Sequence, residues 1–267
     1  MKCIVVIPTY NESSNISRLI NEIFQLVRDI HILIVDDSSP DGTADIVKSL
    51  QREQPNLHLL QRTGPRSFGK SYVDGMRQAL QMGAQFIVQM DADYSHNPRY
   101  LQTFLEAIES CDLVIGSRYL NGVSVVNWPI RRLMLSLGAN TYIRWITGMK
   151  IADATSGYRC WRHKTLAAID FDSIKADGYG FQIEMLYQAD KLGFCLREMT
   201  IIFIDRISGT SKISRKMVFE AIWLPWKLRL RGLFHAVFKN GKHKSIIPAE
   251  MDSCTNLTAD KRFDPAQ

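Results

Sequence analysis

Cysteines are few, and their spacing argues against the two structures that cysteines most often build. The five of them are scattered over 267 residues, and none lies in a Cys-x-x-Cys pair. This pattern gives no support to a disulfide framework or a structural zinc site, and it fits the reducing cytoplasm. The cysteines are Cys3, Cys111, Cys160, Cys195 and Cys254.

Long apolar segments are also missing. No stretch approaches the ~20 apolar residues that a membrane-spanning helix needs, and Met1 runs almost directly into the strand-like CIVVIP without a signal sequence. The sequence therefore predicts a cytoplasmic protein without a transmembrane helix. Its 46% apolar and 22% charged residues are ordinary for a globular chain.

Acidic residues are almost absent from the C-terminal part. Between Arg206 and Lys244, ten lysines and arginines stand against one acid, Glu220, so this segment carries +9 while the rest of the chain carries −3. Such a segment indicates an anionic partner. No recognised nucleic-acid motif accompanies these charges, which makes nucleic acid the weaker candidate.

Apolar strand-like segments alternate with helix-like segments up to about residue 118. Alternation of this kind predicts an α/β fold with a largely parallel sheet and right-handed crossovers, and continuous hydrophobicity suits strands covered on both faces. The expected strands are CIVVIPT, HILIVDD, NLHLLQ, FIVQMDAD and DLVIGSR, and the expected helices between them are Asn15–Arg28, Asp41–Arg52, Gly69–Met82 and Pro98–Ser110.

The rhythm changes after Asn121. Helices are expected over Ile130–Thr147, Phe181–Leu192 and Met217–Phe238, with two strands near Phe194–Ile204. We expect an α/β domain over residues 1–213, a basic amphipathic segment over 214–240 and a disordered tail over 241–267.

Two aspartates end the fourth expected strand. Asp91 and Asp93 close the run FIVQMDAD, and the carboxyl ends of strands in an open α/β sheet are where ligands bind. Unpaired carboxylates are costly to desolvate, so packing explains them poorly, whereas Mg²⁺ or Mn²⁺ takes oxygen ligands of this kind. Taken alone, the pair is also compatible with solvated loop residues.

Polar signatures end three further expected strands, and together with the aspartate pair they favour a nucleotide cleft over ordinary turn chemistry. Asp36 or Asp37 would accept hydrogen bonds from a base or ribose, and Tyr10 offers a face for stacking. The three signatures are PTYNE from Pro8, VDDSSPDGT from Val35 and GSRY from Gly116.

In these motifs the chain resembles the polyprenol-phosphate (dolichol-phosphate) mannose synthases, which are inverting family 2 glycosyltransferases with a GT-A fold. The resemblance runs from about residue 3 to about residue 213. It implies metal-dependent transfer of mannose from GDP-mannose to a polyprenyl or dolichyl phosphate on the cytoplasmic face of a membrane. Further matching motifs are MDADYSHNP, Trp128 with Arg132, Ser136 and Asn140, then TSGYR, GYGFQIEM and DR-x-x-G-x-SK.

The resemblance implies roles for particular residues on the donor side. Asp91 and Asp93 would hold the metal and the diphosphate, with the backbone of Ala92 alongside. Ser95 stands where some relatives have a glutamine ligand. The guanosine end would contact Pro8, Tyr10, Glu12, Val35 and Asp37.

Other roles concern the phosphates and the sugar. Arg132 and Ser136 would face the lipid phosphate, and Gln182 and Glu184 lie in a motif near the sugar. Donor or acceptor phosphates would contact Arg118, Arg206 and Lys212. The residues that would carry the catalytic step are Asp93, Arg118, Arg132 and Arg206.

One loop departs from the family pattern. Relatives carry a Gly- and Leu-rich stretch ending in Ala-Tyr, whereas this chain reads RTGPRSFGKSY from Arg62 to Tyr72. Tyr72 is kept, but Pro65, Arg66 and Phe68 alter the loop. The departure bears on donor-loop flexibility and donor choice.

The acceptor decides whether a general base is needed. A phosphate monoester is largely ionised at neutral pH because its second pKa is about 6, so it can attack the anomeric carbon directly. A hydroxyl acceptor would need a base, for which Asp153 and Glu184 are the candidates. Other readings are a different donor such as UDP-glucose, a nucleotidyltransferase, which the glycine-free Pro8–Glu12 disfavours, and a non-catalytic sugar-nucleotide-binding module.

The expected C-terminal helix has two explanations. Its apolar stripe has the spacing of a helix that packs on a core, and Pro225 should kink or interrupt it. Trp223 and Trp226 with flanking lysines and arginines equally suit a helix lying in a membrane interface. A lipid-linked acceptor favours the second. Nothing in the sequence identifies a membrane-embedded partner subunit.

Overall fold

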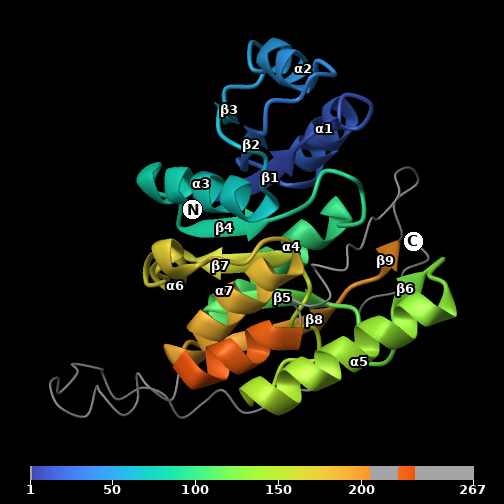
Figure 1. The fold of residues 1–267 in the computed structure, drawn as a ribbon. Helices are drawn as coiled ribbons and strands as arrows, with labels where there is room; N and C mark the ends of the chain where they lie inside the picture. The colour runs from blue at the N-terminus through green and yellow to red at the C-terminus, as the bar shows by residue number, and fades with distance from the viewer. Residues whose placement is uncertain (1, 205–221, 232–267) are drawn as a thin grey trace, which may run out of the picture.

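The centre of the computed structural model, which describes residues 2–204 and 222–231, is a seven-stranded sheet (Figure 1). Its strand order is β3-β2-β1-β4-β7-β5-β8, and all neighbours are parallel except β7, which runs antiparallel to β4 and β5. The strands are β1 (Cys3–Thr9), β2 (His31–Asp36), β3 (Leu57–Gln61), β4 (Phe86–Gln89), β5 (Leu113–Ser117), β7 (Arg159–Arg162) and β8 (Leu196–Thr200).

Helices connect these strands, and the first of them lie close to the predicted ranges. A short parallel pair, β6 (Val125–Val126) with β9 (Phe203–Ile204), stands apart from the main sheet. The α-helices are α1 (Ile16–Leu26), α2 (Thr43–Leu50), α3 (Phe68–Gln81), α4 (Leu101–Ala107), α5 (Ile130–Thr147), α6 (His163–Ala167) and α7 (Tyr179–Lys191). Single 3₁₀ turns lie at Pro98–Tyr100, Ile108–Ser110 and Phe171–Ser173.

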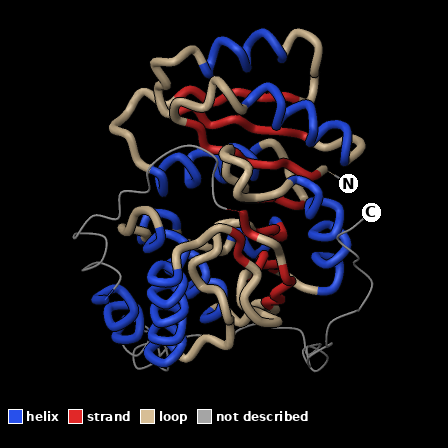
Figure 2. The backbone as a smooth tube through the Cα atoms, turned by 90° about the vertical axis from the view of Figure 1, so that its right-hand side faces the viewer, coloured by secondary structure: helices blue, strands red, loops and turns tan. Residues whose placement is uncertain are grey.

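The inner strands of the sheet are buried on both faces, as the continuous apolar runs predicted, whereas the edge strands β3 and β8 are only partly buried (Figure 2). In β1, Ile4 and Val6 belong to the core shared with α3 and α7, whereas Val5 and Ile7 belong to the core shared with α1 and α4. Helix α3 lies very close to the sheet at Gly75, where an added Cβ would stand 2.5 Å from a Val6 methyl carbon. The two cores fix the strand ends from both sides.

The sequence did not predict β7. Strands β4 and β5 were expected, but no strand was expected between Asn121 and Phe194. In the structure, the four residues of β7 pair with both strands and separate them. A strand this short has no periodicity to reveal it, and both of its partners are distant in sequence.

The region around α5 is the second feature that positions the site. A helical stretch at 222–231 lies beside α5 (Figure 1), with Leu224 and Leu228 buried in the core. The Tyr142 hydroxyl donates to the Ile222 carbonyl over 2.7 Å. This stretch runs through Pro225 without the predicted interruption, because packing on both sides of the proline holds it. The rest of the predicted helix lies outside the described residues.

None of the helices described at 2–204 and 222–231 is long and apolar enough to cross a bilayer.

The strand order reverses between β1 and β4. From β1 the chain adds β2 and β3 on one side, and then β4 on the other side. Ligands of open α/β sheets bind outside the carboxyl ends of the strands at such a switch point. The residues that follow β1 and β4, around Tyr10 and Asp91, therefore occupy the expected ligand position.

Candidate functional site

The loops after β1 and β2 are tied together by a buried carboxylate. Asp36 is fully buried, and its Oδ1 accepts hydrogen bonds from the hydroxyls of Thr9 (3.1 Å) and Ser39 (2.6 Å). The Ser39 hydroxyl in turn accepts from the Asn11 backbone N–H. Asp36 is therefore a structural group, and of the two adjacent aspartates only Asp37 keeps a candidate role toward a ligand.

Three of the strand-end loops contain a residue with left-handed backbone geometry. Asn11 after β1, Ser38 after β2 and Tyr94 after β4 have φ values of 61°, 57° and 63°. Such geometry is uncommon for residues other than glycine, most of all for a bulky tyrosine, and it concentrates at functional sites. All three loops face the same edge of the sheet.

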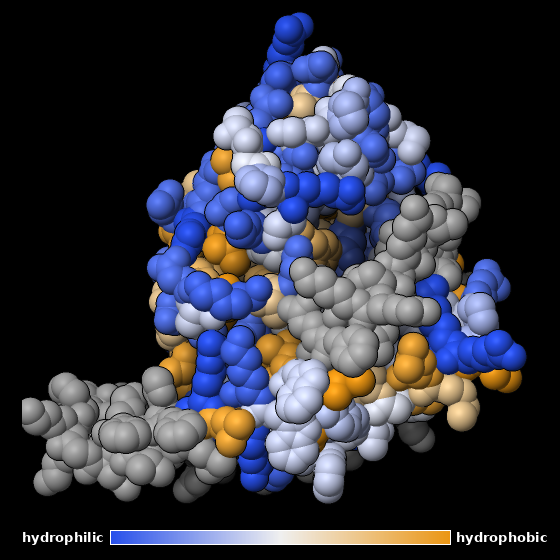
Figure 3. Space-filling model, in the orientation of Figure 1, coloured by the Kyte–Doolittle hydropathy of each residue, from blue (hydrophilic) through white to orange (hydrophobic). Residues whose placement is uncertain are grey.

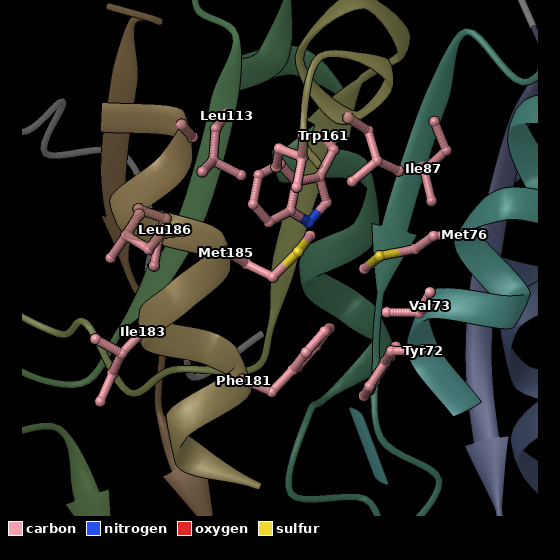
Figure 4. Packing of buried hydrophobic residues seen from close by; sticks show 14 of the residues in the cluster. Tyr72, Val73, Met76, Ile87, Leu113, Trp161, Phe181, Ile183, Met185 and Leu186 are labelled. Atoms are coloured by element: carbon pink, nitrogen blue, oxygen red, sulfur yellow. The ribbon is translucent and has the colours of Figure 1, made fainter. Parts of the chain in front are cut away.

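Asp91 is oriented by a tyrosine from α3. The Tyr72 hydroxyl donates to Asp91 Oδ1 over 2.6 Å, and Tyr72 itself is fully buried, stacked on Phe181 at 5.9 Å (Figure 4). Burial, followed by the charges of Asp91 and Asp93, raises the pKa of Tyr72 well above its ordinary value. The hydroxyl therefore keeps its proton at physiological pH and donates a hydrogen bond to Asp91.

A buried histidine holds the backbone of the same loop. His96 Nδ1 accepts the Asp91 N–H over 2.9 Å, and its ring stacks on Tyr158 at 4.8 Å. Burial lowers the pKa of His96, and this effect outweighs the opposite influence of the nearby aspartates. The ring is neutral and acts as an acceptor, which places it in the scaffold of the aspartate pair.

The aspartate pair suits a hard divalent cation. The Asp91 side chain is 29% exposed, and the Asp93 carboxylate accepts the Ser95 N–H over 3.1 Å. Ser95 itself is buried. Among residues 2–204 and 222–231 there is no group of three or more His, Cys, Asp or Glu side chains able to hold a metal. A cation here would complete its shell with diphosphate oxygens and water, as Mg²⁺ commonly does.

Asp37 is almost fully engaged by the atypical loop. Its Oδ1 accepts from the Arg62 guanidinium at 2.5 Å, and its Oδ2 accepts from the Ser67 N–H at 2.9 Å and the Ser71 hydroxyl at 3.3 Å. Arg62 also pairs with Asp74. The residue expected to bind guanosine thus also holds the loop between β3 and α3.

The other predicted nucleotide contacts lie at the same edge. Tyr10 and Glu12 are half-buried, and the Glu12 N–H donates to the Thr43 hydroxyl. Val35 and Ala92 are buried, so a contact from either would come from its backbone. Pro8 is half-buried at the end of β1.

Arg118 follows β5 and forms a buried ion pair. Its Nε and Nη2 donate to the two carboxylate oxygens of Asp153 over 2.6 and 2.7 Å, and Nη2 also donates to Thr155. Burial alone would raise the pKa of Asp153, but the Arg118 charge and hydrogen bonds outweigh it and lower that pKa. The Arg118 guanidinium is thus bound to Asp153. Its contact with a phosphate stays a prediction.

One face of α5 carries the two predicted acceptor residues, Arg132 and Ser136, followed four positions later by Asn140 of the same motif. Arg132 lies over the Trp128 ring at 4.0 Å, and the Ser136 hydroxyl accepts from the Tyr119 hydroxyl over 2.7 Å. Asn140 binds the Thr155 hydroxyl and the Ala154 N–H. The spacing of the three residues places them on one side of the helix, toward the Arg118–Asp153 pair.

A chain of aromatic rings joins α5 to the aspartate loop. Phe203 of β9 lies 6.2 Å from His96 and 5.6 Å from Trp128, edge to face in both cases. Arg132 therefore connects to the backbone of Asp91 through Trp128, Phe203 and His96. No role was predicted for His96, although it stands in the MDADYSHNP motif, or for Phe203, because their ring contacts come from segments distant in sequence.

The GYGFQIEM motif supports the site from α7. Gln182 accepts from Gln89 of β4 over 2.8 Å, and a Cβ at Gly157 would stand 3.2 Å from Gln182 and 3.3 Å from His96. Glu184 accepts the backbone N–H groups of Lys175 and Ala176. Both side chains are buried and act on neighbouring segments. Arg206 and Lys212 lie outside the described residues.

Comparison with known proteins places the sequence in a family of glycosyltransferases. A sequence model of glycosyl transferase family 2 matches residues 4–170. An undecaprenyl-phosphate mannosyltransferase from Micrococcus luteus is 41% identical over 222 residues, which cover 83% of this chain and 91% of that protein. A polyprenol monophosphomannose synthase from Mycolicibacterium smegmatis is 40% identical over 233 residues, 86% of this chain and 88% of the relative.

Solved structures share the architecture. Glucosyl-3-phosphoglycerate synthase from Mycobacterium tuberculosis in complex with Mn²⁺, UDP and phosphoglyceric acid matches with a TM-score of 0.64 at 16% identity, over 85% of this chain and 78% of that one. Its complex with Mg²⁺ and UDP matches with a TM-score of 0.62 at 17% identity, over 85% and 79%. The fold is the GT-A fold that the sequence resemblance implied.

Proposed function

This chain belongs to glycosyl transferase family 2, and from its site we propose that it transfers mannose from GDP-mannose to a polyprenyl monophosphate with inversion at the anomeric carbon. The observation that carries the proposal is the aspartate pair at the β1/β4 switch point, joined through the ring chain to Arg132 on α5. One end suits a nucleotide diphosphate and the other an anionic acceptor. The two relatives named for mannosyl transfer to polyprenyl phosphates support this reading.

On the donor side, Asp91 and Asp93 would hold Mg²⁺ or Mn²⁺ with the diphosphate. A bound divalent cation stabilises the negative charge that develops on the departing nucleotide. Tyr72 fixes one oxygen of Asp91 and His96 fixes its backbone, so the pair is held before the donor arrives. Such supporting contacts commonly matter 10–100-fold for metal sites, roughly.

On the acceptor side, no general base is required. The phosphate oxygen forms the new bond to the anomeric carbon as the bond to the GDP oxygen breaks, and its proton is already lost at neutral pH. The two candidate bases for a hydroxyl acceptor are both engaged: Asp153 by Arg118, and Glu184 by two backbone N–H groups. This engagement favours the phosphate acceptor. Arg132, half-buried against Trp128, would orient it.

A lipid acceptor requires the enzyme to approach a membrane, and α5 with the 222–231 helix offers a surface for that. Ile130, Trp145 and Trp223 are 76%, 78% and 69% exposed. Exposed Arg144 precedes Trp145, and exposed Lys227 lies four positions after Trp223. In Figure 3, orange and pale residues stand among blue ones along the lower edge of the molecule, where Figure 1 shows these helices. We propose peripheral docking on an anionic cytoplasmic leaflet.

The test is a transfer assay with GDP-mannose and UDP-glucose, each with a short polyprenyl phosphate, with and without a chelator. We expect chelator-sensitive polyprenyl-phosphate mannose from GDP-mannose, with inverted anomeric configuration by NMR. The Asp93→Ala variant should lose about 10²–10³ in kcat. The matched Asp45→Ala variant, at a side chain 81% exposed, should keep it. Transfer from UDP-glucose alone, or turnover indifferent to chelator, would refute the proposal.

A further inference from the structure

The loop that departs from the family pattern places an arginine on the predicted stacking residue. Arg66 Cζ lies 3.7 Å from the centroid of the Tyr10 ring, the shortest cation–ring distance in the described part of the chain. Tyr10 follows β1 directly, at the switch point where a ligand is expected. Arg66 therefore rests on the surface that a nucleobase would use.

Both ends of this loop are anchored by one side chain. Asp37 accepts from the Arg62 guanidinium and from the Ser67 N–H. At the start of the loop, the Arg62 N–H also donates to the Asp36 carbonyl over 2.9 Å, and its carbonyl accepts from the Ser38 hydroxyl. The Ser67 hydroxyl caps α3 by accepting the Lys70 N–H. The ends are therefore part of the rigid site.

The middle of the loop is free of such anchors. Residues 63–66 are exposed, and a Cβ added at Gly64 would meet nothing within 4 Å. Only the cation–π contact is described between Arg66 and the rest of the protein. Arg66 can therefore rise from the Tyr10 ring without breaking any hydrogen bond that holds Arg62 or Ser67.

From this geometry we infer that Arg66 is a specificity-determining residue that closes over the base of the nucleoside diphosphate, so that the base lies between the Tyr10 ring and the Arg66 guanidinium. The inference rests on the proposed function, because it needs a nucleotide at Tyr10. A planar guanidinium stacks face to face on an aromatic ring, whereas an ammonium group can approach the ring only as a point charge. A purine offers it more surface than a pyrimidine, so the clamp favours a purine nucleoside diphosphate.

The test is calorimetric binding of GDP, UDP and inorganic pyrophosphate to the full chain with Mn²⁺. Arg66→Ala should weaken GDP binding about 2- to 30-fold, the range of a cation–π contact from exposed to desolvated, and should leave pyrophosphate binding unchanged. The charge-conserving Arg66→Lys should lose most of the same affinity. Arg52→Ala, at an exposed arginine after α2 and away from the strand ends, is the charge-matched control and should bind like the wild type.

Several outcomes would overturn the clamp. An equal loss for pyrophosphate would mean that Arg66 acts on the phosphates, and wild-type affinity in Arg66→Lys would mean that charge alone matters. Tighter GDP binding in Arg66→Ala would mean that Arg66 blocks the base. Each of these leaves the proposed function standing, because the wild type still binds GDP. If the wild type binds UDP and not GDP, the proposed donor and the purine preference of the clamp are both wrong. A loss of UDP affinity in Arg66→Ala would then support stacking of Arg66 on the base without that preference.

Discussion

The strand-end region (Tyr10, Asp37, Asp91 and Asp93) and the helical region (α5 with 222–231) handle charge and apolar surface in opposite ways. In the strand-end region, Asp37 is bound by Arg62 and two further donors, and Asp91 by Tyr72. In the helical region, tryptophans and arginines stand at the surface. A small ligand of fixed shape needs fixed partners, whereas a fluid bilayer surface needs only exposed apolar area and charge.

A buried arginine–aspartate pair lies beside each region: Arg62 with Asp37 in the strand-end region, and Arg118 with Asp153 next to α5. Removing the two arginines should lower the free energy of unfolding by different amounts. Arg118→Leu leaves Asp153 fully buried without its bidentate partner, and we expect a loss of about 3–5 kcal/mol in the free energy of unfolding. Arg62→Leu should cost less, about 1–3 kcal/mol, because Arg62 reaches only one oxygen of Asp37 whereas Arg118 reaches both oxygens of Asp153. Urea unfolding measures both.

The control for this pair is Arg77→Leu. Arg77 pairs with Asp172, a side chain 89% exposed, so the change should stay within about 0.5 kcal/mol. Equal losses in the free energy of unfolding for Arg62→Leu and Arg118→Leu would show that the two pairs stabilise the fold equally, contrary to what their hydrogen-bond geometry predicts.

Two tyrosine hydroxyls allow a matched comparison of catalysis. Tyr72→Phe removes the bond to Asp91, and we expect turnover to fall about 10–100-fold with a higher metal concentration for half-maximal rate. Tyr119→Phe removes the bond to Ser136 and should raise KM for the polyprenyl phosphate while the metal requirement stays unchanged. Steady-state kinetics over metal and acceptor concentrations would decide. A raised metal requirement in Tyr119→Phe would contradict the separation of the two regions.

The smallest effect concerns membrane docking. The double variant Trp145→Ser, Trp223→Ser should reduce binding to vesicles containing anionic lipid roughly tenfold, since two exposed tryptophans that enter the leaflet only partway contribute about this much. GDP binding should not change. The control is Leu192→Ser, an exposed apolar residue at the end of α7. Sedimentation with vesicles gives the measurement, and unchanged sedimentation of the double variant would remove α5 and 222–231 from the docking surface.

Local patterns predicted the scaffold well. Helix α5 has the bounds expected from its sequence, and four of the five expected strands pair in parallel beside one another, from β3 to β4. These are long apolar or amphipathic segments whose periodicity is set by neighbouring residues. The aspartate pair was found for the same reason, since it stands directly after such a strand.

Contacts between distant segments were not predictable. Nothing in the sequence near Asp37 reveals that Arg62 occupies it, and nothing near Phe203 reveals that it lies between His96 and Trp128. The short β7 joins β4 to β5 by pairing with residues far away in the sequence. Arg159 pairs with Gln89, 70 residues earlier, and Trp161 pairs with Leu113, 48 residues earlier. Each of these depends on packing that only the complete fold defines.

The amino-acid order by itself set the strands, the helices and the acidic pair that follows the fourth strand, because those properties arise from residues adjacent in the chain. Tertiary structure alone decided which charges are neutralised internally and which face outward. Burial and pairing are properties of groups brought together from separate segments. Arg66 is an example, because its proposed role follows from its contact with Tyr10 and is not visible in the sequence around Arg66.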